Sequence, residues 1–220
     1  MTNTKVEIVA LLKRNGGHSV KELAAALHLA AVTVRQHLTH LQRDGLIAAQ
    51  QRPNGYARPS YVFRLTAKGH AASFPRRSDR LVELLVREIS LLEGEELTGL
   101  SKQAKVSLVL QRVAFHLADE FTPFLRGWRL QERVAFVTEV MHADGGFAEW
   151  EAAEGGFEIR DFNCLFHRFF QSENEVCEWH RSFLSRVLGT EVRVTPCPNG
   201  SAQCCRFVIE ATADVTAKAG

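Results

Sequence analysis

Residues 31–45 read AVTVRQHLTHLQRDG, and this stretch decides the fold of the N-terminal part of the chain. Apolar residues recur in it at the spacing of one helix face, which predicts a helix over about 31–43 that ends at Asp44-Gly45. The apolar positions are Val34, Leu38 and Leu41. The opposite face is polar and carries Thr33, Gln36, His37 and His40. Such a helix has one face for a core and one face for a ligand.

Two helices are predicted before this one. The first covers about 4–14 and stops at a Gly-Gly pair, and we expect Val6, Val9, Ala10 and Lys13 to share one of its faces. The second starts at Ser19, where Glu22 three residues later completes the pattern of a capping box. Its apolar stripe consists of Val20, Leu23, Ala24 and Leu27. Three short helices therefore occupy the first 45 residues.

The pattern after residue 45 changes from helix to hairpin. Residues 46–52 and 60–65 read as two strands, and the tip between them is rich in proline, asparagine and glycine. Three helices followed by a basic hairpin form the plan of a winged helix-turn-helix, which places its third helix in the major groove of DNA and its hairpin against the DNA backbone or minor groove. A small helical domain whose polar face only contacts water is the alternative.

Basic and acidic residues are distributed unevenly along the chain. Residues 1–70 contain ten Lys or Arg and three Asp or Glu, whereas residues 71–220 contain seventeen and twenty-two. A basic segment of this size suits a polyanion, so we expect double-stranded DNA as the partner. The residues expected to contact it are Thr33, Arg35, Gln36, His37 and His40 on the helix, and Arg52, Tyr56 and Arg58 in the hairpin.

Two amphipathic helices follow, over about 78–92 and 102–121. The apolar stripe of the first includes Leu81, Leu84, Leu85, Glu88, Leu91 and Leu92. DNA-binding domains of this kind commonly read paired half-sites as two-fold dimers, so either helix is a candidate for homodimerisation. The alternative is that both stripes pack only on their own chain.

The rest of the chain is mixed α+β. Helices are predicted over 130–142 and 173–188, and strands over 147–152, 157–162, 191–195 and 205–210. The expected organisation is a winged helix-turn-helix domain at 1–74, a helical linker and dimerisation region at 75–128, and a cysteine-rich sensor domain at 129–212.

All five cysteines lie between residues 164 and 205, close to the C-terminal end of the chain. Twelve residues separate Cys164 from Cys177, and twenty-seven separate Cys177 from Cys205. Thiolates are soft ligands for iron-sulfur clusters, zinc or copper(I), so these three are the candidate metal ligands. For zinc, His167 or His180 could complete a tetrahedron. Buried packing thiols and a redox disulfide switch are the alternatives, and Cys197 is expected to be a spare thiol.

Several classes of protein are disfavoured. No apolar run approaches the roughly 18 residues of a membrane span, and the first residues lack the pattern of an export signal, so a cytoplasmic protein is expected. CxxC, GxGxxG, phosphate-loop and GxSxG motifs are all missing from the sequence. We therefore expect no enzyme, with a thiol oxidoreductase as the competing hypothesis.

Five stretches together resemble the SufR-like transcriptional regulators, a branch of the ArsR/DeoR-type winged-helix proteins. They are AAVTVRQHLTHLQRDGLI at 30–47, ARPSYVFRLTAKG at 57–69, NCLFH at 163–167, EVCEWHRSFL at 175–184 and CCRFVIE at 204–210. The resemblance covers nearly the whole chain. It implies a dimeric repressor of iron-sulfur-cluster biogenesis genes that holds a cluster, [4Fe-4S] or [2Fe-2S], through Cys164, Cys177 and Cys205.

Two positions depart from this pattern. Ala30 stands where the family often has a serine that caps the recognition helix, and that cap is worth about 1 kcal/mol. Cys204 adjoins Cys205, so either could be the third ligand, although the strand that follows aligns better with Cys205. The sequence thus predicts a repressor that senses iron-sulfur or redox status and controls cluster biogenesis or stress genes. A winged-helix regulator with a structural zinc or a thiol switch is the alternative.

Overall fold

The computed structural model describes residues 3–52, 60–74, 79–164, 173–196 and 204–211, without the side chains of 173–178 and 196. Within those residues it contains eight α-helices and six strands in two sheets, which confirms the predicted α+β class. The chain divides into two compact units, one holding the described residues up to 74 and the other those from 79 onward. Each unit is described by itself below.

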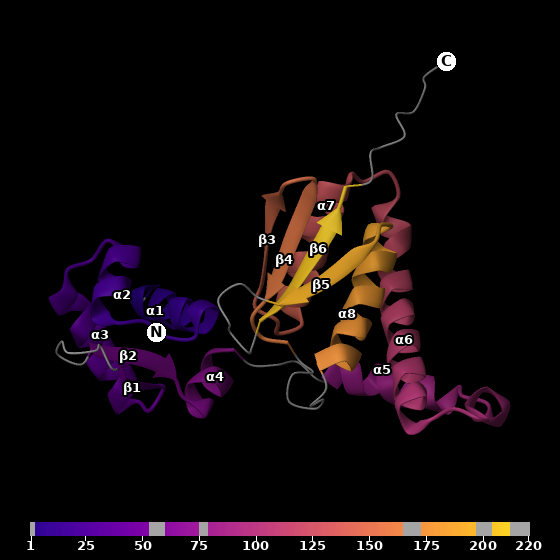
Figure 1. Cartoon of the computed structure of the whole chain (residues 1–220), viewed down its shortest axis with the longest axis horizontal. Helices are drawn as coiled ribbons and strands as arrows, with labels where there is room; N and C mark the ends of the chain where they lie inside the picture. Colours follow the sequence, from indigo (N-terminus) through magenta and orange to yellow (C-terminus); the bar gives the residue numbers. More distant parts are fainter. Residues whose placement is uncertain (1–2, 53–59, 75–78, 165–172, 197–203, 212–220) are drawn as a thin grey trace, which may run out of the picture. The chain divides into compact units, whose positions relative to one another are not determined.

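The first unit begins with three helices, α1 (Asn3–Asn15), α2 (Val20–Leu27) and α3 (Ala31–Arg43), shown in indigo and purple in Figure 1. The predicted capping box is present at the start of α2: Ser19 N–H donates to Glu22 Oε2 at 2.6 Å, and Glu22 N–H donates to Ser19 Oγ at 3.3 Å. The three helices share one core, whose fully buried members include Ile8, Leu12, Leu23, Val34, Leu38 and Leu41.

The predicted face of α1 is wrong in part. Val6 is 50% exposed, and the buried apolar residues are Ile8, Val9 and Leu12. Lys13 is buried as predicted, with its Nζ atom 3.3 Å from His70 Nδ1 and 5.4 Å from the centre of the Phe74 ring. A long lysine stem can enter a core when its amine finds polar and aromatic partners.

The hairpin of the first unit consists of β1 (Ile47–Arg52) and β2 (Ser60–Leu65), which pair antiparallel from Ile47↔Leu65 to Arg52↔Ser60. His18 extends this sheet by two backbone hydrogen bonds with Phe63, of 3.1 and 2.8 Å. A short helix, α4 (Ala67–Ser73), follows β2 and was not predicted. Gly69 in α4 packs so tightly that a Cβ atom there would lie 1.9 Å from the carbonyl oxygen of Leu46, so only glycine fits.

The helices of the second unit are α5 (Asp79–Ser90), α6 (Lys102–Phe121), α7 (Leu130–Ala143) and α8 (Glu173–Leu188). Two 3₁₀ turns, Gly94–Leu97 and Thr122–Leu125, flank α6. Helices α6 and α8 lie side by side (Figure 1), and Arg186 makes a bidentate ion pair with Asp119 at 2.6 and 2.9 Å across them. None of the described helices combines the length and apolar character needed to cross a bilayer.

The apolar stripe of α5 packs largely on its own chain. Leu84 and Glu88 are buried, and Leu81 and Leu85 pack against the core that α6 and α8 share. Leu91, which the sequence placed in the same stripe, lies beyond the end of α5 and is 57% exposed. The stripe therefore serves the fold of the unit, and any dimer contact would use another face of α5.

The sheet of the second unit contains β3 (Ala148–Ala153), β4 (Gly156–Asp161), β5 (Val192–Pro196) and β6 (Cys205–Glu210). Its order is β3-β4-β6-β5, with every neighbouring pair antiparallel. Helix α7 contacts β3 and β4, and α8 contacts β5. Both helices thus cover the face that carries the fully buried Ile159, Phe207 and Ile209.

Candidate functional site

Helix α3 turns a polar surface away from the core of the first unit. Val34, Leu38 and Leu41 fix its inner face. Of the residues expected to contact DNA, Arg35, Gln36 and His40 are exposed, whereas Thr33 and His37 are half-buried. The Nδ1 atom of His37 is buried and makes no hydrogen bond among the described residues, so a contact from this ring to a base would use Nε2.

The N-terminus of α3 lacks a side-chain cap, as Ala30 predicted. Ala30 has an extended backbone, and no side-chain hydrogen bond forms at that position. The first four backbone N–H groups of a helix have no partner within the helix and need others, such as water or a ligand. The turn that precedes α3 contains His28, the C-cap of α2, which adopts a left-handed backbone at φ 54°.

Arg52 closes β1 and is exposed, as expected for a residue that contacts a phosphate. Its Nη1 atom lies 3.7 Å from Glu22 Oε1. Hydrogen bonds from Ser19 lower the pKa of the Glu22 carboxyl, which keeps it ionised and attractive to Arg52. Such a loose, exposed pair contributes little stability, so a DNA phosphate can replace the carboxylate as the partner of Arg52.

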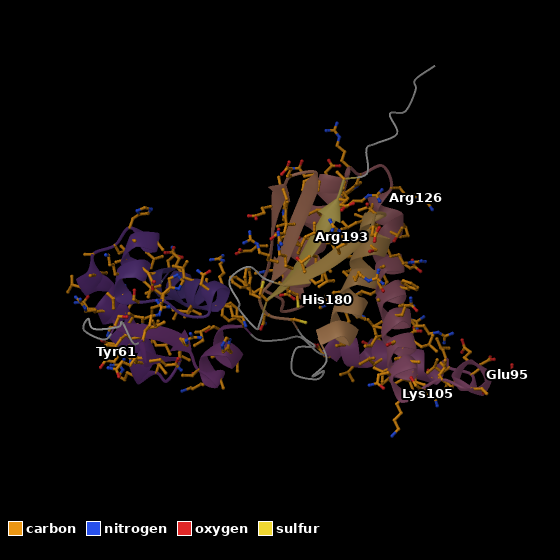
Figure 2. The ribbon with its side chains drawn as sticks, in the orientation of Figure 1. Tyr61, Glu95, Lys105, Arg126, His180 and Arg193 are labelled. Atoms are coloured by element: carbon orange, nitrogen blue, oxygen red, sulfur yellow. The ribbon has the colours of Figure 1, made fainter. Side chains whose placement is uncertain are left out.

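Two hairpin residues expected to contact DNA, Tyr56 and Arg58, lie outside the described residues. The structure adds Tyr61 to the hairpin residues that are candidates for contacting DNA, because it is 57% exposed on β2, opposite Gln51 (Figure 2). An aromatic ring with a hydroxyl on a basic hairpin can contact a nucleic-acid backbone. The signal in the sequence that could have indicated it is an aromatic residue with a hydroxyl in the strand that follows the basic tip.

A second cluster of polar residues lies at one end of the sheet in the second unit. Asp161 ends β4 and Cys205 begins β6, and the two are register partners. The pairs Ile159↔Phe207 and Asp161↔Cys205 are two residues apart and therefore share one face of the sheet. Because Ile159 and Phe207 are fully buried on that face, Asp161 and Cys205 lie at the edge of the core.

Three potential metal ligands converge at this edge. A carboxylate oxygen of Asp161, Sγ of Cys164 and a ring nitrogen of His180 all lie within 4.8 Å of one another. The side chains are 2%, 2% and 5% exposed, respectively. His180 comes from α8, where its ring lies 5.5 Å from that of Phe207 in β6 and 4.6 Å from that of Trp179 (Figure 2). The cluster is therefore built from a strand, the segment after it and a helix.

Asp161 is held in place by the backbone around it. Its Oδ1 atom accepts hydrogen bonds from the N–H groups of Phe147, at 3.3 Å, and Asn163, at 2.9 Å. Burial is the main cause that raises the pKa of Asp161, followed by the nearby Cys164, while His180 and the two backbone hydrogen bonds act in the opposite direction. Asn163 also donates from Nδ2 to Gly145 O at 2.6 Å, which ties the turn before β3 to this cluster.

The predicted cysteine ligands differ in where they lie relative to this cluster. Cys164 is in the cluster, and Cys205 begins the strand paired with Asp161. Cys177 belongs to α8, three residues before His180, although its side chain is not described. Cys204 is disulfide-bonded, whereas Cys164 and Cys205 carry thiols, which favours Cys205 as the third ligand. His167 and Cys197 lie outside the described residues.

Thiols beside a buried imidazole and carboxylate form a donor set that fits an iron-sulfur cluster or zinc.

Comparison with known proteins identifies the first unit. Residues 1–48 match the family model described as winged helix-turn-helix DNA-binding. Among curated proteins and among solved structures, none matches the chain. The match covers α1, α2, α3 and the start of β1, the elements that form the helix-turn-helix and lead into the hairpin. The first unit therefore contains a winged helix-turn-helix DNA-binding domain, which supports the role of a DNA-binding transcriptional regulator for this chain and favours that role over an enzyme.

Proposed function

We propose that this regulator is a repressor that senses iron-sulfur or redox status through a cluster held by Cys164, Cys177 and Cys205, and that it controls genes of cluster biogenesis or stress. The observation that carries the proposal is the buried convergence of Cys164, Asp161 and His180 beside the start of β6. The resemblance of the cysteine segments to SufR-like regulators supports the same assignment.

The cluster, when bound, would supply a group that changes charge on reduction and is lost on oxidation. The residues of the chain supply its surroundings. Trp179, Phe183 and Phe207 exclude water, since all three are at least 93% buried. Burial of thiolates in an apolar core is costly without a cation, so loss of the cluster would favour a different arrangement of these segments.

Helix α8 offers a route from the cluster to the rest of the second unit. It carries both Cys177 and His180 in its first half, and it packs along α6. Helix α6 in turn packs against α5. A shift of α8 on cluster loss would therefore reach α5, which is the helix that we propose to join two copies of the chain.

The outer face of α5 suits a homodimer. Val82, Val86 and Ile89 lie one turn apart and are 55%, 63% and 56% exposed. Three adjacent β-branched side chains on one helix face are an unusual exposed apolar patch for a monomer. Two copies packed through this face would bring two recognition helices into one molecule, as paired half-sites in DNA require.

The charged residues beside this patch are complementary to those of a second copy of the chain. Glu83 and Arg87 are exposed on one flank of the patch, one turn apart. In an antiparallel pair of α5 helices related by a two-fold axis, like flanks meet, so Glu83 of each copy would lie opposite Arg87 of the other. The exposed apolar patch pairs about nearly the same point of the helix, because Val82 would then lie near Ile89 of the other copy.

The substitution Val86→Lys tests this dimer. It places two like charges at the centre of the interface, so we expect sedimentation equilibrium to show a monomer where the unaltered chain is a dimer. Val6→Lys is the matched control, because Val6 is also an exposed valine, at 50% against 63% for Val86, and lies on a helix of the other unit. A dimer that persists in Val86→Lys, or one lost equally in Val6→Lys, would place the interface elsewhere.

The proposed function is tested with protein purified without oxygen. Iron, acid-labile sulfide and zinc are assayed on one sample, and the cluster-loaded and cluster-free forms are then compared for binding to duplex DNA selected by the protein from a random pool. Matching iron and sulfide, with affinities that differ at equal salt, would support the proposal. Stoichiometric zinc in a colourless protein would indicate a structural site, which the mixed sulfur, nitrogen and oxygen donors also suit. Equal DNA affinity of the two forms would eliminate sensing.

A further inference from the structure

We propose that His180 is a fourth, protein-supplied ligand of the metal centre, in addition to the three cysteines. This inference rests on the proposed function, because it assigns one more ligand to the same cluster. It also predicts a distinctive property: one iron would carry a nitrogen ligand, whereas a centre held by three thiolates alone leaves that iron to an outside ligand.

The position of His180 carries the assignment. Its ring nitrogen lies within 4.8 Å of Cys164 Sγ and of a carboxylate oxygen of Asp161, which is close enough for Cys164 and His180 to bind one metal centre. The ring is 5% exposed and packs between Trp179, in its own helix, and Phe207, in β6. These contacts fix the imidazole on the side of α8 that faces the end of the sheet.

The composition of the cluster points to a cation rather than to ordinary core packing. An acid, a thiol and an imidazole, each at least 95% buried, meet in a core otherwise built from residues such as Ile159, Phe183 and Phe207. Grouping buried ionisable side chains is costly unless an ion or a hydrogen-bond network compensates. A metal would bind the thiolate and the neutral imidazole directly and would offset the negative charge of the carboxylate.

Helix spacing favours His180 over Asp161 as the ligand. Cys177 and His180 are three residues apart in α8, a spacing that lets one helix supply two ligands to one centre. Asp161 already anchors two backbone N–H groups through Oδ1, which gives it a structural role in the turns around Phe147 and Asn163. We assign to Asp161 the position of a charged neighbour of the ligands.

Pulsed electron paramagnetic resonance of the reduced cluster tests the assignment. The full chain is prepared without oxygen with histidine labelled by ¹⁵N, and a nitrogen hyperfine coupling to the cluster is expected. The coupling should disappear in His180→Cys, whose new thiolate keeps the cluster, and in His180→Gln. It should persist in His142→Gln, the matched control, because His142 is exposed in the same unit.

Each result separates this inference from the proposed function. A wild-type protein without iron and sulfide would overturn both. A wild-type cluster that shows no nitrogen coupling would overturn only the role of His180, and so would a coupling that persists in either His180 variant. If both variants fail to fold, the absence of a nitrogen coupling in the wild-type spectrum still overturns the role of His180. A second expected result is a lower reduction potential in His180→Cys, because replacing thiolate by imidazole raises the potential of iron-sulfur clusters.

Discussion

Replacing Cys164 with alanine is expected to yield a folded protein that holds no iron-sulfur cluster. Cys164 is 2% exposed and lies between Asp161 and His180, so no solvent-exposed residue can take the place of its thiolate. The loss of one buried sulfur resembles the loss of one buried methyl group and should cost about 1 kcal/mol of unfolding free energy. Iron and sulfide assays on anaerobic protein, with circular dichroism to follow the fold, measure both effects.

Cys197→Ala is the control for this experiment, because Cys197 is the cysteine that sequence analysis set apart from the ligands. It should keep the iron and sulfide content of the unaltered chain. The Cys164→Ala protein should bind DNA like the cluster-free form of the unaltered protein at equal salt. Retention of the full cluster in Cys164→Ala together with its loss in Cys197→Ala would overturn the choice of ligands.

The first unit could be predicted from sequence because its signals are local. The capping box at Ser19 and the apolar spacing in α3 each depend on residues within a few turns of one another. The unpredicted helix α4 has a weaker signal: its sequence, AKGHAAS, contains a glycine and lacks an apolar stripe, and only the N-cap is local, with Thr66 Oγ1 accepting a hydrogen bond from Gly69 N–H at 3.0 Å. The close packing of Gly69 on the Leu46 backbone is a contact that only the folded chain supplies.

The candidate metal site, too, was predicted from the sequence only in part. The clustered cysteines indicated Cys164, Cys177 and Cys205 as ligands, and the resemblance pointed to the same three, but Asp161 was not predicted. Its place in the site depends on the register of β4 with β6 and on the approach of α8, neither of which the spacing of residues reveals. His180 was considered only as a zinc ligand, because a single histidine in a helix is more often a core or capping residue.

Alanine at Gln36 and alanine at Arg52 are expected to weaken DNA binding in two different ways. Gln36 is exposed on α3, where an amide can make a bidentate contact to adenine that is worth about 1–3 kcal/mol. Gln36→Ala should therefore lower the affinity for selected DNA by about 10–100-fold and leave the affinity for random DNA nearly unchanged. Arg52 ends β1 with an exposed guanidinium, so Arg52→Ala should weaken binding to both kinds of DNA.

Salt titration distinguishes the two roles. A lost phosphate contact lowers the slope of log K against log salt concentration by about 1, whereas a lost base contact leaves that slope unchanged. Arg52→Ala should show the smaller slope, and Gln36→Ala should keep the slope of the unaltered protein. Arg126→Ala is the charge-matched control, because Arg126 is exposed in the second unit and should change neither quantity (Figure 2). Equal slopes for all four proteins would remove Arg52 from the DNA interface, and an unchanged preference for selected DNA in Gln36→Ala would remove Gln36 from base recognition.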